Sequence, residues 1–424
     1  MKIERSKNIG KSAAFAAAAA VILGICIWGH VRVFRAAGPL PPWRGDALEY
    51  HQIAVRWRSE GRYMSGGQGV PRARYAVRVP GFPAMLVVLH TAAERVGLHR
   101  TALVRPANMA LNLGTVGATF ATGCVIGMPV VGAIGAGLTA LYTPLWGAAA
   151  ENMPECLFTF LVSVGVLFMA AAFKTGRSRF QAISGLSLGA ATLVRATTQF
   201  MPLALLVALL AARQRRWKAH FVVFALAFLA AISPWLVRNY RIFHRPVGLT
   251  SVGGLNTFLG NYLPFRGLAR KATYQMLVPR IAGRSRDEMQ ADRLLYRAAI
   301  RNIARYASRR PLAYAGLLWE KHMRLWELYR ASGALPWPLS RFLSSMEIHR
   351  GLLLLAMIGL VVALLCERRL WVVAVAPAYL NVVHVLTYTE PGRYNLAMIP
   401  QVALLAGLAL SYLLPRIGGK AGGG

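Results

Sequence analysis

Acidic residues are scarce in this chain of 424 amino acids. It contains 15 Asp and Glu against 49 Lys and Arg, which gives a formal net charge of +34. Charged residues make up only 15% of the chain and hydrophobic residues 56%, whereas soluble domains carry about 25% charged residues. This composition argues against an ordinary soluble enzyme. Because the basic residues alternate with long apolar runs, their excess indicates anionic lipid head groups or phosphate-bearing substrates rather than nucleic acid.

Cysteine is also rare, and several catalytic motifs are absent. The four cysteines lie in or beside apolar runs without CxxC or Cys/His metal spacing, which argues against a structural disulfide or a zinc site. The chain has no GxxxxGK[ST], no GxGxxG after a strand and no HExxH, and its GxSxG match, GLSLG at 185–189, lies inside an apolar run rather than at a strand-to-helix turn. A nucleotide-consuming pump or a soluble-type hydrolase would therefore lack its chemistry.

Apolar runs of spanning length predict about ten transmembrane helices. The first run follows a basic tail and is interpreted as a retained signal anchor. The predicted spans lie near 12–34, 103–126, 130–148, 155–173, 183–197, 199–212, 219–239, 351–366, 370–388 and 395–414. Within 181–212, two short helices on either side of Arg195 or one re-entrant element would both fit the pattern.

The short basic segments predict which side is cytoplasmic. They lie at 174–179, 213–218 and 367–369 and in the tail, and they place both termini inside. Two long segments, 35–102 and 240–350, then lie outside, and the stretches from Arg35 to Arg78 and from Arg241 to Arg341 within them carry 26 of the 49 basic residues. Phosphate is the natural explanation for this basic outer surface. We therefore expect one catalytic membrane domain over residues 1–414, followed by a Gly-rich cytoplasmic tail, 415–424.

Two segments of the outer loops are expected to lie in the membrane interface. Residues 287–311 form an amphipathic pattern, with a basic ridge of Arg293, Arg297, Arg301 and Arg305 beside an apolar ridge of Leu295, Ala299 and Ile303. We expect the basic side to face lipid phosphates, and a solvated face without a ligand is the alternative. Residues 80–98 are apolar but too short and too charged to span.

Acidic side chains at the membrane edge are candidates for chemistry, because charge is costly there. Asp46 and Glu49, followed by Tyr50, lie just after the first span, where a carboxylate could remove a proton from an acceptor hydroxyl. Simple solvation is the alternative for these two acids. Glu151 and Glu155 lie in an outer turn and could bind a sugar or a cation, while Glu155 could equally favour a helix N-terminus.

Arginines and amides recur at the same predicted outer edge of the membrane. Arg78 precedes a proline-rich turn, Arg195 interrupts an apolar run, and Arg238 and Asn239 end the motif PWLVRN. Such groups can donate to phosphate and to sugar hydroxyls. The alternatives are exposure for Arg78, a carboxylate partner for Arg195 and snorkelling for Arg238.

The remaining candidates lie in a glycine-rich stretch and in the last outer turn. They are Asn256, Asn261, Glu390, Arg393 and Tyr394. Glu390 and Arg393 could instead pair with one another.

The order of these motifs resembles that of the GT-C membrane glycosyltransferases, in particular the family 39-like branch with protein O-mannosyltransferases and lipid A aminoarabinose transferases. The similarity covers about residues 1–414, and RVPGFP at 78–83 and PWLVRN at 234–239 are its more specific parts. The resemblance implies an all-α polytopic fold with outer juxtamembrane helices. It also implies inverting transfer from a lipid-linked donor, usually a polyprenyl-phosphate-sugar, with Asp46 as the base. Many relatives have adjacent acids, whereas two residues separate Asp46 from Glu49.

The chemistry of these residues agrees with the resemblance. Displacement at an anomeric carbon needs a base for the incoming hydroxyl and positive charge for the departing phosphate. Asp46 can supply the first, and Arg78, Arg195, Arg238 or Arg393 the second. A divalent cation shared by Asp46 and Glu151 is permitted but not required.

We therefore predict a glycosyltransferase of the cytoplasmic membrane, with its active site facing the periplasm or exterior. The donor is a polyprenyl-phosphate-sugar, and the acceptor is a hydroxyl or phosphate of a glycan, lipid or protein. The alternative is a carrier or flippase of lipid-linked sugars, although carriers often have repeated halves and a charged path near the midplane. A non-catalytic membrane scaffold would leave Asp46 and PWLVRN without a role.

Overall fold

The protein is described by a computed structural model over residues 2–38, 45–66, 74–214, 216–270, 272–328, 345–366 and 371–418. These residues are helical apart from turns and loops, and the one extended pairing among them is an isolated antiparallel bridge between Ser65 and Arg74. The predicted all-α class is confirmed.

Five of the described helices are long and apolar enough to cross a membrane. They are α1 (Lys2–Ala36), α7 (Glu155–Thr175), α10 (Trp217–Phe243), α16 (Met346–Leu365) and α18 (Ile399–Gly418). Together, α5 (Pro129–Ala140) and α6 (Thr143–Ala149) would form a sixth span that is bent by 54°. The chain is therefore a multi-pass membrane protein.

Four further helices coincide with predicted spans but are shorter or less apolar. They are α4 (Val104–Val125), α8 (Ser178–Val194), α9 (Met201–Ala211) and α17 (Trp371–Leu386). The count of about ten spans therefore stays a prediction. A short 3-10 turn, η1 (Ala196–Thr198), separates α8 from α9. Residues 181–212 thus form two helices with Arg195 at their junction.

Small residues let the central helices approach closely. A Cβ atom added to Gly123 of α4 would lie 2.2 Å from the Cα of Gly132 in α5, and one added to Gly185 of α8 would lie 2.4 Å from the carbonyl oxygen of Phe224 in α10. Such close packing stabilises the bundle through van der Waals contacts, because in lipid there is no hydrophobic driving force between helices. The resulting bundle surrounds α18, which is buried over most of its length.

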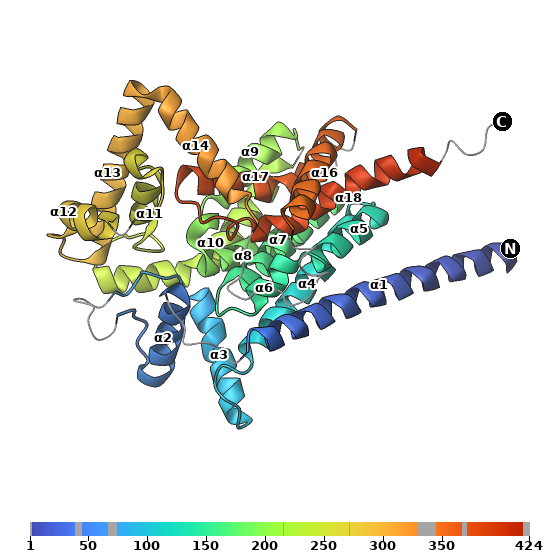
Figure 1. Cartoon of the computed structure of the whole chain (residues 1–424), viewed down its shortest axis with the longest axis horizontal. Coiled ribbons are helices and arrows are strands. Elements are labelled where there is room, and N and C mark those ends of the chain that lie inside the picture. Colours follow the sequence, from blue (N-terminus) through green and yellow to red (C-terminus); the bar gives the residue numbers. More distant parts are fainter. Residues whose placement is uncertain are drawn as a thin grey trace.

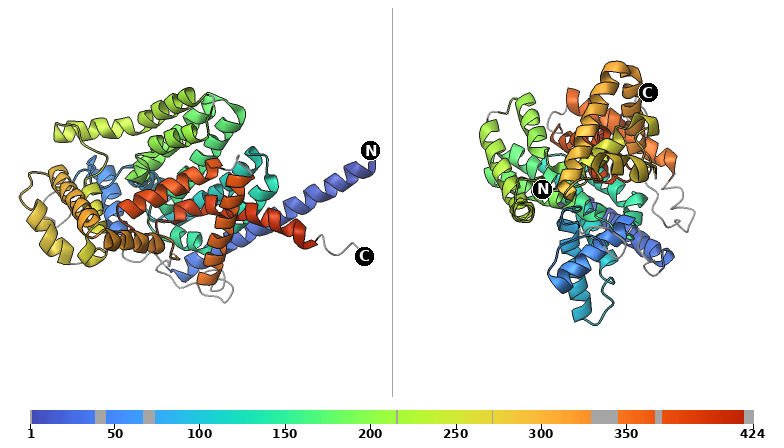
Figure 2. Two further views of the ribbon diagram at one scale, coloured as in Figure 1. Left: turned by 90° about the horizontal axis from the view of Figure 1, so that it is seen from above. Right: turned by 90° about the vertical axis from the view of Figure 1, so that its left-hand side faces the viewer.

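The helices that do not span gather at one end of the bundle, away from the two chain termini (Figure 1). They are α2 (Gly45–Glu60), α3 (Gly81–Arg95), α11 (Gly253–Gly260), α12 (Val278–Ala282), α13 (Glu288–Arg309) and α14 (Pro311–Leu325). The left view of Figure 2 also places both termini at the other end. This agrees with the predicted location of both termini on one side of the membrane.

Helix α13 has the predicted amphipathic pattern, but its apolar ridge contacts protein. Leu295 and Ala299 are buried, and they pack with Phe258 of α11 and Ala282 of α12. The apolar ridge thus closes a small core of its own, and the expected location of this helix in the membrane interface stays a prediction. The basic ridge at Arg293, Arg297, Arg301 and Arg305 is exposed, as expected.

Candidate functional site

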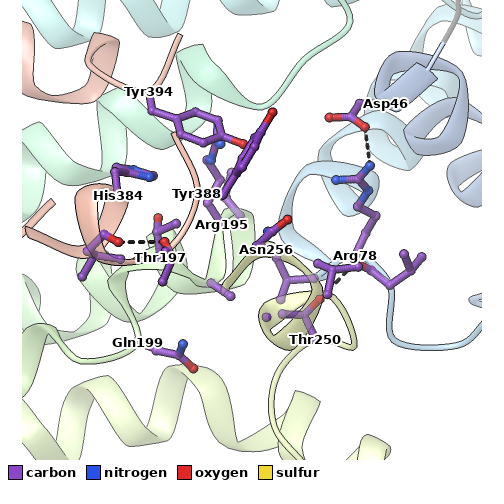
Figure 3. Close-up of a pocket in the computed structure, with 18 of the residues that line it drawn as sticks. Asp46, Arg78, Arg195, Thr197, Gln199, Thr250, Asn256, His384, Tyr388 and Tyr394 are labelled. Atoms are coloured by element: carbon purple, nitrogen blue, oxygen red, sulfur yellow. Dashed lines mark hydrogen bonds and ion pairs between the residues drawn. The ribbon is translucent and has the colours of Figure 1, made fainter. Parts of the chain in front are cut away.

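A cavity of about 150 Å³ lies where the non-spanning helices meet the bundle. It is called the charged cavity here, because its lining includes Asp46, Arg78, Arg195 and Arg393. Figure 3 shows the first three of these side chains around the cavity. These residues come from α2, the loop before α3, the end of α8 and the turn between α17 and α18. The fold thus brings together four of the predicted site motifs that are far apart in sequence.

Asp46 lies in the first turn of α2, where the helix dipole favours a negative charge. Its Oδ1 atom accepts from Arg78 Nη2 at 2.5 Å, and its Oδ2 atom lies 3.3 Å from Arg393 Nη1. Burial alone would raise the pKa of Asp46, but the two guanidinium groups outweigh burial and lower it below its usual value. Asp46 is therefore ionised at neutral pH.

Glu49 lies one turn beyond Asp46 and holds Arg78 from behind. Glu49 Oε2 accepts from Arg78 Nε at 2.7 Å, and its Oε1 accepts from the Ser65 hydroxyl at 2.5 Å. The Arg78 guanidinium also lies over the Tyr50 ring, 5.0 Å from its centroid. Two carboxylates and one ring thus fix Arg78 at the wall of the cavity, while Glu49 itself does not line it.

Glu155 holds two other arginines of the cavity, Arg195 and Arg393, as Glu49 holds Arg78. Its side chain is 3% exposed, and its Oε1 atom accepts from Arg195 Nη1 at 2.7 Å and from Arg393 Nε at 2.5 Å. Arg195 leaves the end of α8 in an extended conformation, and its guanidinium lies 4.2 Å from the ring centroid of Tyr394. Glu155 thus lies in the first turn of α7, as one of its two weighed roles requires, and it is also the carboxylate partner that was weighed for Arg195.

The arrangement leaves positive charge in excess at the cavity surface. Arg78, Arg195 and Arg393 line the cavity with Asp46, whereas Glu49 and Glu155 lie behind the arginines. Burial alone would lower the pKa of Arg393, but Glu155 and Asp46 help to raise it well above its usual value. Guanidinium groups in a fixed position suit phosphate oxygens.

Several predicted site residues lie elsewhere. Arg238 donates from Nη1 to the Tyr75 carbonyl at 2.6 Å and from Nη2 to the Tyr63 carbonyl at 2.9 Å, and it lines a neighbouring cavity instead. Asn239 is fully buried and donates to the Gly248 carbonyl at 3.0 Å. The contacts of Arg238 support the loop that carries Arg78, whereas that of Asn239 holds the segment after α10.

Asn261, Glu151 and Glu390 are also outside the lining of the charged cavity. Asn261 is buried, donates to the Leu386 carbonyl at 2.8 Å and accepts from the Tyr314 hydroxyl. Glu390 accepts from the Tyr388 hydroxyl at 2.9 Å, and Arg393 pairs with Asp46 and Glu155 rather than with Glu390. Asn256, in contrast, reaches the cavity from α11, and Tyr394 also lines it (Figure 3). Tyr50 is part of the same lining.

Comparisons with known proteins agree with this architecture. The family model for dolichyl-phosphate-mannose-protein mannosyltransferase matches residues 107–237. Among solved structures, the apo oligosaccharyltransferase of Archaeoglobus fulgidus has a TM-score of 0.56 at 13% identity, covering 94% of this chain and 51% of its own. The chain has the GT-C fold. The resemblance seen in the sequence is thus confirmed at the level of the fold.

Two other solved structures are similar. The archaeal oligosaccharyltransferase AglB from Archaeoglobus fulgidus, in complex with an inhibitory peptide and a dolichol-phosphate, has a TM-score of 0.56 at 12% identity, over 93% of this chain and 50% of its own. ArnT from Cupriavidus metallidurans bound to undecaprenyl phosphate has a TM-score of 0.42 at 18% identity, over 93% and 78%. The chain spans about half the length of the archaeal enzyme. No match was found among curated proteins.

Sequence reasoning missed several polar residues of this GT-C cavity. Thr197, Gln199, Thr250, His384 and Tyr388 all line it (Figure 3). His384 had a usable signal, because an ionisable residue inside a predicted span is a candidate by default. The others lie in turns, where polar residues are common.

A metal site is not formed by the candidate acids. Among the described residues, no three His, Cys, Asp or Glu side chains are grouped to hold a metal ion. Glu151 does not line the charged cavity with Asp46, and both Asp46 oxygens already contact arginine. The shared cation that the sequence permits is therefore not supported by these contacts, and a cation requirement stays untested.

Proposed function

We propose that the protein is an inverting glycosyltransferase that moves a sugar from a polyprenyl-phosphate-linked donor to an acceptor hydroxyl or phosphate at the outer face of the cytoplasmic membrane. The observation that carries this proposal is the charged cavity, in which three arginines and one carboxylate face one small space. The GT-C fold supports it, since the archaeal oligosaccharyltransferase of the same fold was solved with a dolichol-phosphate.

The arginines would stabilise the leaving group. In a single displacement, the acceptor oxygen attacks the anomeric carbon, and the bond from that carbon to the phosphate oxygen breaks. The polyprenyl phosphate leaves with the electron pair, so negative charge develops on its oxygens. Arg78 and Arg393 present N–H donors at opposite sides of Asp46, and these donors would turn from Asp46 to that charge.

Asp46 would accept the proton of an incoming hydroxyl. In the free protein its basicity is reduced, because both carboxylate oxygens contact arginine. A donor phosphate competes for the same two guanidinium groups, so donor binding would weaken these contacts and raise the pKa of Asp46. On this view Asp46 becomes an effective base only when the donor is in place.

The neutral side chains that line the charged cavity would recognise the sugar. Asn256, Gln199 and Thr250 offer neutral donors and acceptors, as sugar hydroxyls require. The ring of Tyr394 is fixed by Arg195 and offers an apolar face.

The decisive experiment uses purified protein and labelled polyprenyl-phosphate-sugars, and it measures release of polyprenyl phosphate together with transfer to an acceptor. Asp46→Asn keeps the size of the side chain and removes its charge, and loss of a general base costs about 10²–10⁴ in rate. Glu60→Gln is the matched control, because Glu60 is exposed at the other end of the same helix. Turnover by Asp46→Asn within a few-fold of Glu60→Gln would exclude Asp46 as the base. Transport of the lipid-linked sugar without transfer would favour a carrier instead.

A further inference from the structure

A second cavity of about 500 Å³ lies beside the charged cavity. It is called the aromatic pocket here, because four aromatic rings and two arginines contribute to its lining: Trp57, Tyr63, Tyr75, Trp235, Arg62 and Arg238. It is formed by the end of α2, the loop before α3 and the last turns of α10. The transfer chemistry proposed above makes no use of it.

The aromatic pocket is separate from the charged cavity, although the two share a wall. Val79 and Val194 line the charged cavity, whereas the adjacent residues Pro80 and Leu193 line the aromatic pocket. The Tyr63 hydroxyl donates to the Arg78 carbonyl at 3.0 Å and fixes this wall. A molecule in the aromatic pocket would therefore lie behind Arg78 rather than against its guanidinium.

The walls of the pocket are rigid and largely apolar. The rings of Trp57 and Tyr63 meet edge to face at 5.1 Å, and those of Tyr63 and Trp235 at 4.9 Å. The polar atoms of two of these rings are already used, because Trp235 Nε1 donates to the Leu249 carbonyl at 2.7 Å and Tyr63 donates to Arg78. These two rings therefore offer apolar surface rather than hydrogen-bonding groups to a ligand.

The charge of the pocket is positive. The Arg238 guanidinium lies over the rings of Trp235 and Tyr63, 4.4 and 5.2 Å from their centroids, and Arg62 is exposed at the rim. Among the residues that line the pocket in the described part of the chain, none is Asp or Glu. Ring surface with guanidinium groups and no carboxylate suits an amphiphile with an anionic head.

The pocket is also placed where a lipid would reach it. It lies at the last turns of α10, which is long and apolar enough to span the membrane. Val237 and Tyr240 of the same turns are 49% and 54% exposed. Trp, Tyr and Arg at the end of a span are typical of the membrane interface, where lipid phosphates lie.

We infer that the aromatic pocket binds the phosphate head group and the first chain carbons of an anionic phosphate-bearing lipid. Such a lipid could be a phospholipid of the surrounding bilayer or a lipid acceptor, and both share this chemistry. The inference does not depend on the proposed transfer reaction, because it rests on the pocket alone.

The test measures lipid binding to the full chain by native mass spectrometry in detergent, with palmitoyl-oleoyl phosphatidylglycerol as the probe and the matching phosphatidylcholine for comparison. Ile242→Trp adds bulk to a residue that lines the pocket, and Val237→Trp makes a similar change on the exposed face of the same helix. Arg62→Ala removes a charge at the rim, and Arg95→Ala removes an exposed charge at the end of α3.

We expect wild type and both controls to prefer phosphatidylglycerol. Ile242→Trp should weaken its binding about tenfold, and Arg62→Ala about three- to tenfold, as for loss of one charge-assisted contact. Equal binding by Ile242→Trp and Val237→Trp would overturn the inference. If thermal unfolding shows that Ile242→Trp does not fold, Arg62→Ala decides the matter, and binding equal to that of Arg95→Ala is then the overturning result.

The source of the lipid is distinguished by kinetics. A raised acceptor KM in Arg62→Ala, with an unchanged donor KM, would identify the lipid as the acceptor. Unchanged kinetics with weaker phosphatidylglycerol binding would identify a bilayer lipid. Should wild type show no transfer at all, the proposed function fails while the binding comparison still judges the pocket.

Discussion

Replacing Glu155 with Gln removes one buried negative charge without changing the size of the side chain. In the wild-type protein a single oxygen, Oε1, accepts from Arg195 at 2.7 Å and from Arg393 at 2.5 Å. The Arg195 and Arg393 side chains are only 13% and 14% exposed, so water cannot easily replace the lost carboxylate. Breaking a buried pair costs about 3–5 kcal/mol. Because the Gln amide oxygen keeps an acceptor in place, we expect about 2–4 kcal/mol of destabilisation.

The assay compares thermal unfolding of the purified variants in one detergent, followed by sugar transfer at a temperature at which all variants are folded. Glu390→Gln is the matched control, because Glu390 lies in the same turn as Arg393 but accepts from the neutral Tyr388 hydroxyl. The control should lose about 1 kcal/mol or less. Transfer by Glu155→Gln should fall at least about tenfold, since a misplaced guanidinium no longer stabilises the leaving phosphate.

Two results would refute this reasoning. Equal melting temperatures for Glu155→Gln and Glu390→Gln would mean that the ion pairs of Glu155 contribute no more than one neutral contact. A lowered melting temperature with wild-type transfer would mean that Arg195 and Arg393 need no fixed position, which would refute the proposed catalytic role of the charged cavity.

Three other predictions follow from the same contacts. Arg238→Ala should reduce donor use about tenfold or more, because the loop that leads to Arg78 loses its support. Arg238→Lys should recover only part of the donor use, since one ammonium group cannot replace a guanidinium fork. Full transfer by the Ala variant would contradict this prediction. Burial raises the pKa of Asp292 to about 6, despite its bonds to backbone N–H groups at the start of α11. Because folding raises the pKa of this carboxyl, the folded protein loses stability as the pH rises from about 4 to 6. Asp292→Asn should therefore be more stable than wild type by about 1–2 kcal/mol at pH 7 and differ little at pH 4. Parallel pH profiles of the two proteins in thermal unfolding would refute this. Cysteines at the exposed positions Ser59 and Ser308 should react with an impermeant reagent only from outside the cell, and labelling of either from the cytoplasm alone would reverse the predicted topology. Ser65 is unsuitable for this purpose, because it is buried and bonded to Glu49.

The spans were predictable because each depends on a local run of apolar residues. The boundaries of α7 and α10 differ from the predicted 155–173 and 219–239 by four residues or fewer at each end. The bend between α5 and α6 was not predicted within 130–148, although Pro144 lies just after the break. A proline at the first turn of a helix permits such a break but does not require it.

The role of α13 shows the limit of a pattern on one helix. Its ridge of Leu295 and Ala299 was correctly identified as apolar, yet an apolar ridge fits a membrane and a neighbouring helix equally well. The choice was made by α11 and α12, which supply Phe258 and Ala282. No feature of the 287–311 sequence specifies those partners.

The sequence by itself determined the all-α membrane class, the positions of the helices and the pool of charged residues from which the site is drawn. These follow from composition and from periodicity along the chain, which act over a few turns of helix. Only the tertiary structure decided that Arg78, Arg195 and Arg393 share one cavity with Asp46, while Arg238 lies in another. The pairing of Glu155 with Arg393 joins residues 238 positions apart. Such a contact forms only when α7 packs into the bundle around α18. The strength of a buried ion pair depends on the distance between the charges and on their burial, and both are set by the folded chain.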